Sequence, residues 1–156
     1  MGQVWVVGEA LIDLVPEASL AVKAIVGGGP ANTAKALSGL GYEVSFVGGI
    51  SSDEFGELIS AELREAGVNL SLVKFSDLPT ATAKVFLDGA GKASYKFTLD
   101  GTSTFSFSKS WLPTGTPSVI HIGTLATIVE PGASELFGWI QSNGVPIVFD
   151  PNVRAS

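Results

Sequence analysis

The sequence predicts an α/β fold in which helices flank a doubly wound, mostly parallel sheet. Short apolar runs that end at Gly or Asp recur along the chain, as buried parallel strands do. Segments with apolar residues at helical spacing lie between these runs. Strands that alternate with helices form parallel sheets through crossover connections, and this alternation therefore defines the expected class.

The expected elements follow one another in a regular order. The run from Val4 to Val7 ends at Gly8 and is the expected first strand, and residues 12–26 are expected to be extended segments broken at Pro16. The first helix is expected to stop at Gly41, and the second to be capped by Ser52 or Asp53. Helices are expected over residues 31–40, 54–66 and 131–142, and strands over 44–47, 72–75, 82–87, 93–99, 118–122 and 145–149.

The segments 82–87 and 93–99 alternate apolar and polar residues and flank a turn over residues 88–91. This pattern is typical of a hairpin with one face in water. Because the hairpin interrupts the alternation of strands and helices, we expect a small β-rich flap beside the main sheet. The last expected strand leaves a sheet edge that proteins normally cover, so we expect the 156 residues to be a truncated part of a larger domain.

Composition excludes several function classes. The formal net charge is −6 and the nine basic residues are spread thinly, which excludes the basic footprint of a nucleic-acid-binding protein. No apolar run approaches the length of a membrane span, and the N-terminus lacks the basic region of a signal peptide. The chain has no cysteine, which excludes thiolate metal sites and suits a cytoplasmic protein.

The segment from Gly27 to Asn32 is the strongest candidate for a binding site. Three glycines lead into a helix with Pro30 in its first turn, and the unpaired N–H groups of such a helix start can bind an anion or hydroxyl groups. The alternative is a tight turn without a ligand. Asp13 is expected at the end of the first strand, where a carboxylate can accept hydrogen bonds from vicinal hydroxyls or else cap a turn.

Five segments together resemble the PfkB (ribokinase-like) family of carbohydrate kinases, and its fructokinase members above all. They occur in the order of that family: Gly8 to Asp13, Gly27 to Ala34, Leu40-Gly41, Val47 to Gly56 and Phe149 to Arg154. The resemblance implies that residues 1–156 are the N-terminal sugar-binding part of a kinase domain. It also implies that segments of about 14–26 and 81–100 form a β lid over the sugar.

The resemblance implies a set of substrate-binding residues, namely Asp13, Gly27, Gly28, Gly29, Asn32, Phe97, Asn152 and Arg154. ATP and Mg²⁺ would bind mainly in the C-terminal half of a complete enzyme, where a Gly-Ala-Gly-Asp segment supplies the catalytic base. The chain has no such segment, so we expect no catalytic residue and no metal ligand in it. Leu99 stands near the place where relatives that act on acidic sugars carry Arg, which favours a neutral sugar.

Several of these residues have a structural alternative. Asn32 can cap its helix, Phe97 can pack within the hairpin, and Arg154 can fray at the terminus. The lone histidine, His121, is flanked by two isoleucines and is expected to be a core or strand-end residue. Asp53 and Gly56 are expected to serve the start of a helix rather than chemistry.

The function implied is transfer of the γ-phosphate of ATP to a hydroxyl group of a neutral sugar by a cytoplasmic, fructokinase-like enzyme. The isolated chain would be inactive, since it carries the acceptor site alone. Two alternatives stay open: a non-catalytic sugar-binding or interaction module from a truncated or split kinase, and a nucleoside kinase of the same family. An open hairpin edge favours homodimerisation through the lid, while nucleic acid and membrane are not expected as partners.

Overall fold

The computed structural model describes residues 2–17, 21–87 and 93–152. Its strands are β1 (Val4–Val7), β2 (Leu11–Pro16), β3 (Val22–Gly27), β4 (Val44–Val47), β5 (Gly49–Ser51), β6 (Lys74–Ser76), β7 (Thr82–Leu87), β8 (Ala93–Thr98), β9 (Val119–Gly123) and β10 (Ile147–Asp150). Its helices are α1 (Gly29–Gly39), α2 (Glu54–Glu65) and α3 (Gly132–Asn143), with 3₁₀ turns at Ser103–Phe105 and Leu125–Thr127. The predicted α/β class is confirmed.

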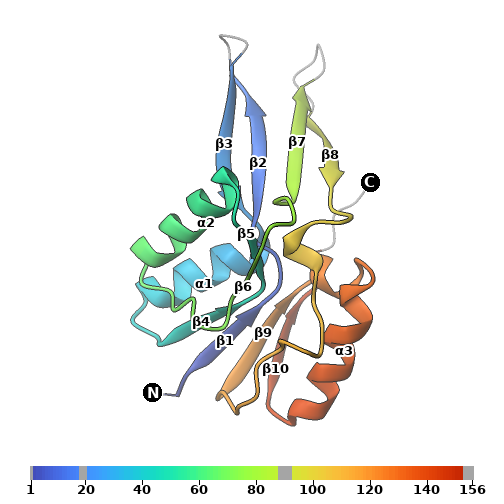
Figure 1. The fold of residues 1–156 in the computed structure, drawn as a ribbon. Coiled ribbons are helices and arrows are strands. Elements are labelled where there is room, and N and C mark those ends of the chain that lie inside the picture. Colours follow the sequence, from blue (N-terminus) through green and yellow to red (C-terminus); the bar gives the residue numbers. More distant parts are fainter. Residues whose placement is uncertain (1, 18–20, 88–92, 153–156) are drawn as a thin grey trace.

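The main sheet has four parallel strands in the order β10-β9-β1-β4. Helices α1 and α2 cover one face of this sheet and α3 covers the other, so the molecule has three layers (Figure 1). Because successive residues of a strand point to opposite faces, β1 supplies both cores. Val4 and Val6 pack with residues of α1 and α2, whereas Trp5 and Val7 pack in the cluster that contains Leu136 of α3.

A second sheet of four strands, in the order β3-β2-β7-β8, stands beyond the carboxyl ends of the main strands (Figure 1). It joins two antiparallel hairpins, β2–β3 and β7–β8, through a parallel pairing of β2 with β7. The strands of the predicted hairpin are confirmed, and its turn over residues 88–91 lies outside the described residues. The expectation of extended segments broken at Pro16 is confirmed, because β2 ends at Pro16 and pairs over its full length with β3.

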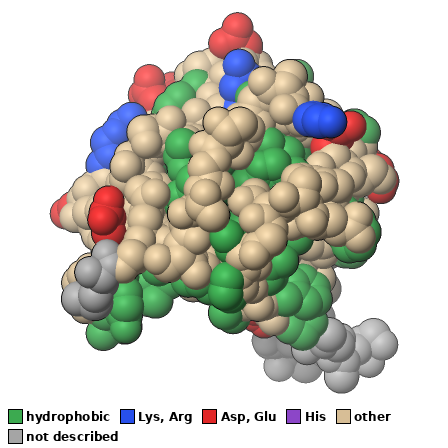
Figure 2. Space-filling view, turned by 90° about the horizontal axis from the view of Figure 1, so that it is seen from below, with side chains coloured by type: hydrophobic (Ala, Val, Ile, Leu, Met, Phe, Trp, Pro, Cys, Tyr) green, Lys and Arg blue, Asp and Glu red, His purple; other side chains and the backbone are tan. Residues whose placement is uncertain are grey.

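Strand β10 lies at an edge of the main sheet, as expected for the last strand. The side chains of Ile147, Val148 and Phe149 are exposed there, and Phe137 of α3 and Ile128 are exposed as well. Figure 2, which views the molecule from below, shows apolar side chains open to solvent on the face that it presents. Exposed apolar surface of this kind marks a place that a partner or a further part of a protein can cover. Within the described residues, none of the helices has the length and apolar character needed to cross a membrane.

Asp53 connects the start of α2 to the segment that leads into β7. Its carboxylate accepts hydrogen bonds from the N–H of Gly56 (2.8 Å), the N–H of Thr80 (2.9 Å) and the hydroxyl of Thr80 (2.6 Å). Burial acts to raise the pKa of this carboxyl, but the hydrogen bonds outweigh it and hold the pKa below its ordinary value. The interpretation of Asp53 as the cap of a helix is confirmed.

Replacing Asp53 by alanine is expected to destabilise the fold by about 1–2 kcal/mol, because α2 loses its N-cap and Thr80 loses its acceptor. Urea unfolding at pH 7 measures the change, and Asp100→Ala, at an exposed aspartate, is the control. The stabilisation requires the carboxylate form, so the difference should shrink as the pH falls through the lowered pKa. Equal stability of the two variants at pH 7 would contradict this role.

Candidate functional site

The first turn of α1 lies directly over the ends of β1 and β9. A Cβ atom at Gly8 or at Gly123 would overlap the ring of Pro30, so the two glycines together make the space that this ring occupies. Pro30 is itself buried and suits the first turn of a helix, where its missing N–H is not needed. This packing fixes the N-terminus of α1 at the carboxyl edge of the main sheet, where open α/β sheets bind ligands.

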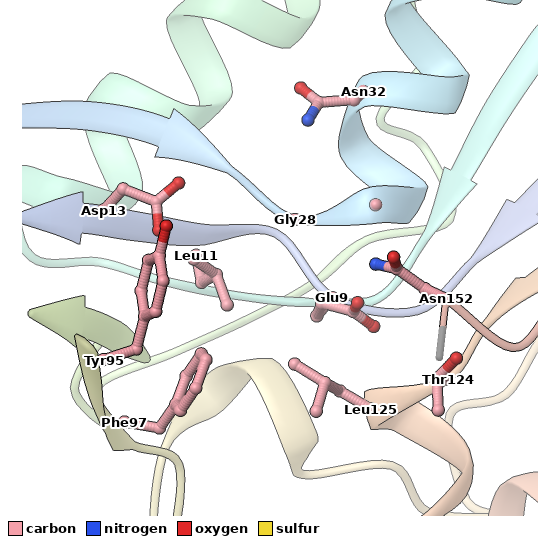
Figure 3. Close-up of a pocket in the computed structure, with 11 residues that line it drawn as sticks. Glu9, Leu11, Asp13, Gly28, Asn32, Tyr95, Phe97, Thr124, Leu125 and Asn152 are labelled. Carbon is pink, nitrogen blue, oxygen red and sulfur yellow. The ribbon is translucent and has the colours of Figure 1, made fainter. Parts of the chain in front are cut away.

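A cavity of about 650 Å³ opens at this edge, between the start of α1 and the second sheet. Its volume is in the range of sites for small molecules. Figure 3 shows the side chains that line it, which come from the second sheet, from α1 and from the segments that follow β1, β9 and β10. The lining residues are Glu9, Leu11, Asp13, Gly28, Gly29, Asn32, Tyr95, Phe97, Thr124, Leu125 and Asn152.

The space available to a side chain differs among the three consecutive glycines. The carboxyl group of Asp13 occupies the space that a side chain at Gly27 would need. Gly28 has a φ of 104°, and a Cβ there would lie 2.5 Å from the carbonyl oxygen of Glu9. Gly29 borders open space, with the nearest heavy atoms 4.0 Å from the position of an added Cβ. The turn is therefore shaped by its neighbours at Gly27 and Gly28, and it is open toward the cavity at Gly29.

Asp13 belongs to β2 of the second sheet, where it pairs with Ile25 and Ala83. The expectation that it ends the first strand is wrong, because the chain turns after β1 and begins a new strand at Leu11. Its side chain is half-buried and nevertheless lines the cavity beside the glycine turn. In Figure 3 the hydroxyl of Tyr95 points toward this carboxyl group. The structure thus brings Asp13 and the glycine turn to one cavity.

Tyr95 and Phe97 form an aromatic wall on β8. They are two residues apart on one strand, so both point to the same side, and their rings stack with centroids 6.2 Å apart at an angle of 19°. Both are 49% exposed, which leaves their faces available to a ligand. Leu99 packs instead against the cluster formed by Leu11, Ala81, Ala83 and Phe105. Tyr95 and Phe97 therefore line the cavity, and Leu99 does not.

Asn32 does not cap α1. The N-cap residue is Gly28, and the N–H of Asn32 donates to the Gly28 carbonyl (3.0 Å) as part of the first turn. The amide side chain lies at the rim of the cavity (Figure 3). Its exposed position leaves the amide available to donate and accept hydrogen bonds there.

Asn152 reaches the cavity from the segment after β10. Its φ is 39°, a conformation that Asn tolerates better than most residues, and its N–H donates to Oδ1 of Asp150 (2.9 Å). The hydroxyl of Thr124 donates to the carbonyl of Asp150 (2.8 Å), which ties the ends of β9 and β10 together. Arg154, the remaining predicted site residue, lies outside the described residues.

Glu9 is a charged lining residue that the sequence did not single out. It is only 4% exposed, and its Oε2 is buried without a hydrogen-bond partner among the described residues. Burial raises the pKa of its carboxyl from 4.5 to about 7; the negative charge of Asp150 adds to this rise, and the N–H groups of Glu9 and Ala126 oppose it. The sequence does offer one signal for Glu9, which is a charged residue close to the end of a buried apolar strand.

His121 lies on β9 and is half-buried, as expected for a strand residue. Burial lowers the pKa of its imidazole, and the negative charge of Asp150 opposes this effect. It is not among the residues that line the cavity. In the described part of the chain, no group of three or more His, Cys, Asp or Glu side chains is arranged to hold a metal ion.

Comparison with known proteins gives consistent matches. The family model for the pfkB family of carbohydrate kinases matches residues 1–156. The fructokinase of Salmonella typhimurium is 31% identical over 157 residues, which cover 97% of this chain and 51% of the relative. The crystal structure of apo fructokinase from Vibrio cholerae superposes with a TM-score of 0.88 at 29% identity and covers 99% of this chain and 55% of that one.

A second Vibrio cholerae fructokinase structure, in a form bound to fructose, ADP and a calcium ion, has a TM-score of 0.84 at 27% identity. It covers 99% of this chain and 52% of that one. The fold and the cavity define an α/β protein with a cavity of small-molecule size beside a parallel sheet and a smaller β-sheet. The chain belongs to the pfkB family of carbohydrate kinases. It spans about half the length of the curated relatives that it matches.

Glu9→Gln is expected to raise the free energy of unfolding, relative to the wild type, more at pH 8 than at pH 4.5. The folded state holds a proton on Glu9 up to about pH 7, whereas the unfolded chain releases it near pH 4.5. The wild type therefore loses stability as the pH rises through this window, by about 3 kcal/mol for a shift of that size, and the variant does not. Urea unfolding from pH 4.5 to pH 8 measures the difference, and a constant difference would contradict the raised pKa.

Substitution by alanine should change the free energy of unfolding by very different amounts at two neighbouring glycines. Gly28→Ala is expected to cost about 2 kcal/mol or more, because of its positive φ and the nearby carbonyl of Glu9. Gly29→Ala is expected to change the free energy of unfolding by less than about 1 kcal/mol, since the added methyl group meets nothing closer than 4.0 Å. Thermal and urea unfolding compare the two variants, and equal losses would contradict the described geometry.

Proposed function

We propose that this chain is the sugar-binding part of an ATP-dependent, fructokinase-like carbohydrate kinase that acts on a neutral sugar. The observation that carries the proposal is one cavity that brings together Asp13 of β2 with Gly28, Gly29 and Asn32 at the start of α1. The family of the chain supports it, as does the fructose in a similar structure. Five of the proposed substrate-binding residues besides Asp13 line the same cavity, namely Gly28, Gly29, Asn32, Phe97 and Asn152.

The chemistry of the lining fits a polyol. The carboxylate of Asp13 can accept hydrogen bonds from two hydroxyl groups, and the amide of Asn32 can both donate and accept. The exposed rings of Tyr95 and Phe97 offer an apolar surface to the C–H face of a sugar. We assign residues of about 14–26 and 81–100, which contain β2, β3, β7 and β8 in part or in full, to a lid over this sugar.

In this proposal the described residues bind and orient the acceptor hydroxyl and help to exclude water from it. Phosphoryl transfer depends chiefly on such positioning and on stabilisation of charge. ATP would supply the phosphoryl group when bound, and the described residues hold no metal-binding cluster that would fit Mg²⁺. The nucleotide site, Mg²⁺ and the catalytic base are therefore assigned to the part of a complete kinase that this chain does not match.

The fructokinase interpretation is favoured over the two alternatives. The similar proteins named above are fructokinases, which gives no support to a non-catalytic module or to a nucleoside kinase. The proposal includes a cytoplasmic location, with which the absence of cysteine is compatible. It also includes a homodimer, since β3 and β8 lie at the open edges of the second sheet.

Isothermal titration of the purified chain with fructose, ribose, gluconate and adenosine tests the ligand class. Fructose is expected to bind more tightly than gluconate or adenosine, and a coupled assay for ADP release is expected to show no turnover. Absence of binding by any sugar, or a preference for adenosine, would contradict the proposal.

Asp13→Asn is expected to weaken fructose binding by about 10- to 100-fold, because a charged acceptor is lost from the cavity. The control is Asp100→Asn, at an exposed aspartate outside the lining residues. An unchanged affinity of the Asp13 variant for fructose would show that Asp13 does not contact the sugar.

A further inference from the structure

Glu9 combines burial with a position in the wall of the cavity. The side chain is 4% exposed and yet lines the cavity, on the far side of Leu11 from Asp13 (Figure 3). Its Oε2 has no hydrogen-bond partner among the described residues. A buried oxygen without a partner is costly, and such groups are nearly always satisfied by protein, water or ligand. The backbone N–H groups of Glu9 and Ala126 act on this carboxyl group, yet they leave Oε2 unpaired. A carboxyl group that lines a cavity with incomplete hydrogen bonding is a candidate to bind a polar group of a ligand.

Gly29 provides a second, independent observation. A Cβ at this residue would lie 4.0 Å from both Oε1 of Glu9 and the amide nitrogen of Asn152. The carboxyl and the amide thus converge on the space that a side chain at Gly29 would fill. Gly29 is the first residue of an eleven-residue helix, and no side chain caps that helix start. Two polar groups and a helix N-terminus consequently surround a small open volume.

We propose that Glu9 is a second sugar-binding residue, whose carboxyl group hydrogen-bonds a hydroxyl of the sugar at the Gly29 end of the cavity. This assignment rests on the proposed function. The raised pKa keeps a proton on the carboxyl up to about neutral pH, so the group can donate one hydrogen bond and accept another. Asp13, at the other side of Leu11, contacts different hydroxyls of the same molecule. The two carboxyls together fix the sugar at two separated points.

A selectivity consequence follows from the contact. A site that hydrogen-bonds one particular hydroxyl rejects the analogue that lacks it, because the buried polar group is then left without a partner. Glu9 should therefore make the cavity discriminate against one monodeoxy sugar, and Asp13 should account for others. This discrimination separates a residue that touches the ligand from one that only supports the fold.

The test uses fructose and its monodeoxy analogues as probes, with dissociation constants measured by titration for the full chain. In the wild type, one analogue is expected to bind at least about tenfold more weakly than fructose. In Glu9→Ala, fructose is expected to bind about tenfold or more weakly, and the discrimination against that analogue should disappear. Glu65→Ala, at an exposed glutamate of α2, is the matched control and should behave as the wild type does.

Gly29→Ala provides a second variant that does not depend on the folding of Glu9→Ala. Its methyl group fills the space between Glu9 and Asn152, so it should also abolish the discrimination while the thermal unfolding temperature stays near that of the wild type. Unchanged fructose affinity in both variants, or an equal loss for fructose and every analogue, would overturn the role of Glu9 alone. A wild type that binds no sugar at all would instead overturn the proposed function, and the role of Glu9 with it.

Discussion

The contact of Pro30 with Gly8 and Gly123 is the constraint on which the site depends. Both glycines lie where their strands end, and any side chain at either position would push α1 away from the sheet. With α1 seated there, the backbone of Gly28 and Gly29 reaches the carboxyl edge of β1 and β9, and Asn32 follows one turn later. The second sheet then closes the other side through β2, which continues almost directly from β1. The cavity results because α1, the main sheet and β2 meet at a point where Gly8 and Gly123 have no side chains.

The same close packing explains the unusual state of Glu9. The residue directly follows the glycine that admits Pro30, so its side chain is shielded by the helix above it and by the 3₁₀ turn that contains Ala126. Burial near the negative charge of Asp150 favours the neutral carboxyl. Asp53 shows the opposite outcome, because its carboxylate receives three hydrogen bonds that outweigh its burial. The two acidic residues differ in charge state through hydrogen bonding and solvation, and not through residue type.

The sequence predicts the local elements well because each has a local cause. Apolar runs predict β1, β4 and β9, and Asp53 predicts the start of α2 through the preference of aspartate for caps. It does not predict β5, a three-residue strand that exists only by pairing with β6. It misplaces Asp13, because a strand boundary between Val7 and Leu11 depends on which sheet each segment joins. It also overlooks Glu9, whose importance comes from neighbours more than a hundred residues away, such as Ala126 and Asn152.

The two aromatic rings on β8 offer the cavity an apolar contact surface. Tyr95 and Phe97 are half exposed in a strand at the edge of the second sheet, and Leu11 and Leu125 add apolar lining to the same cavity. A bound sugar would cover this apolar surface and would give the polar groups of the cavity hydrogen-bond partners. The rings carry little information about which hydroxyl is present, since stacking depends on a face and not on a donor. In the proposed function, selectivity therefore comes from the carboxyl groups of Asp13 and Glu9, which lie on either side of Leu11 in the cavity.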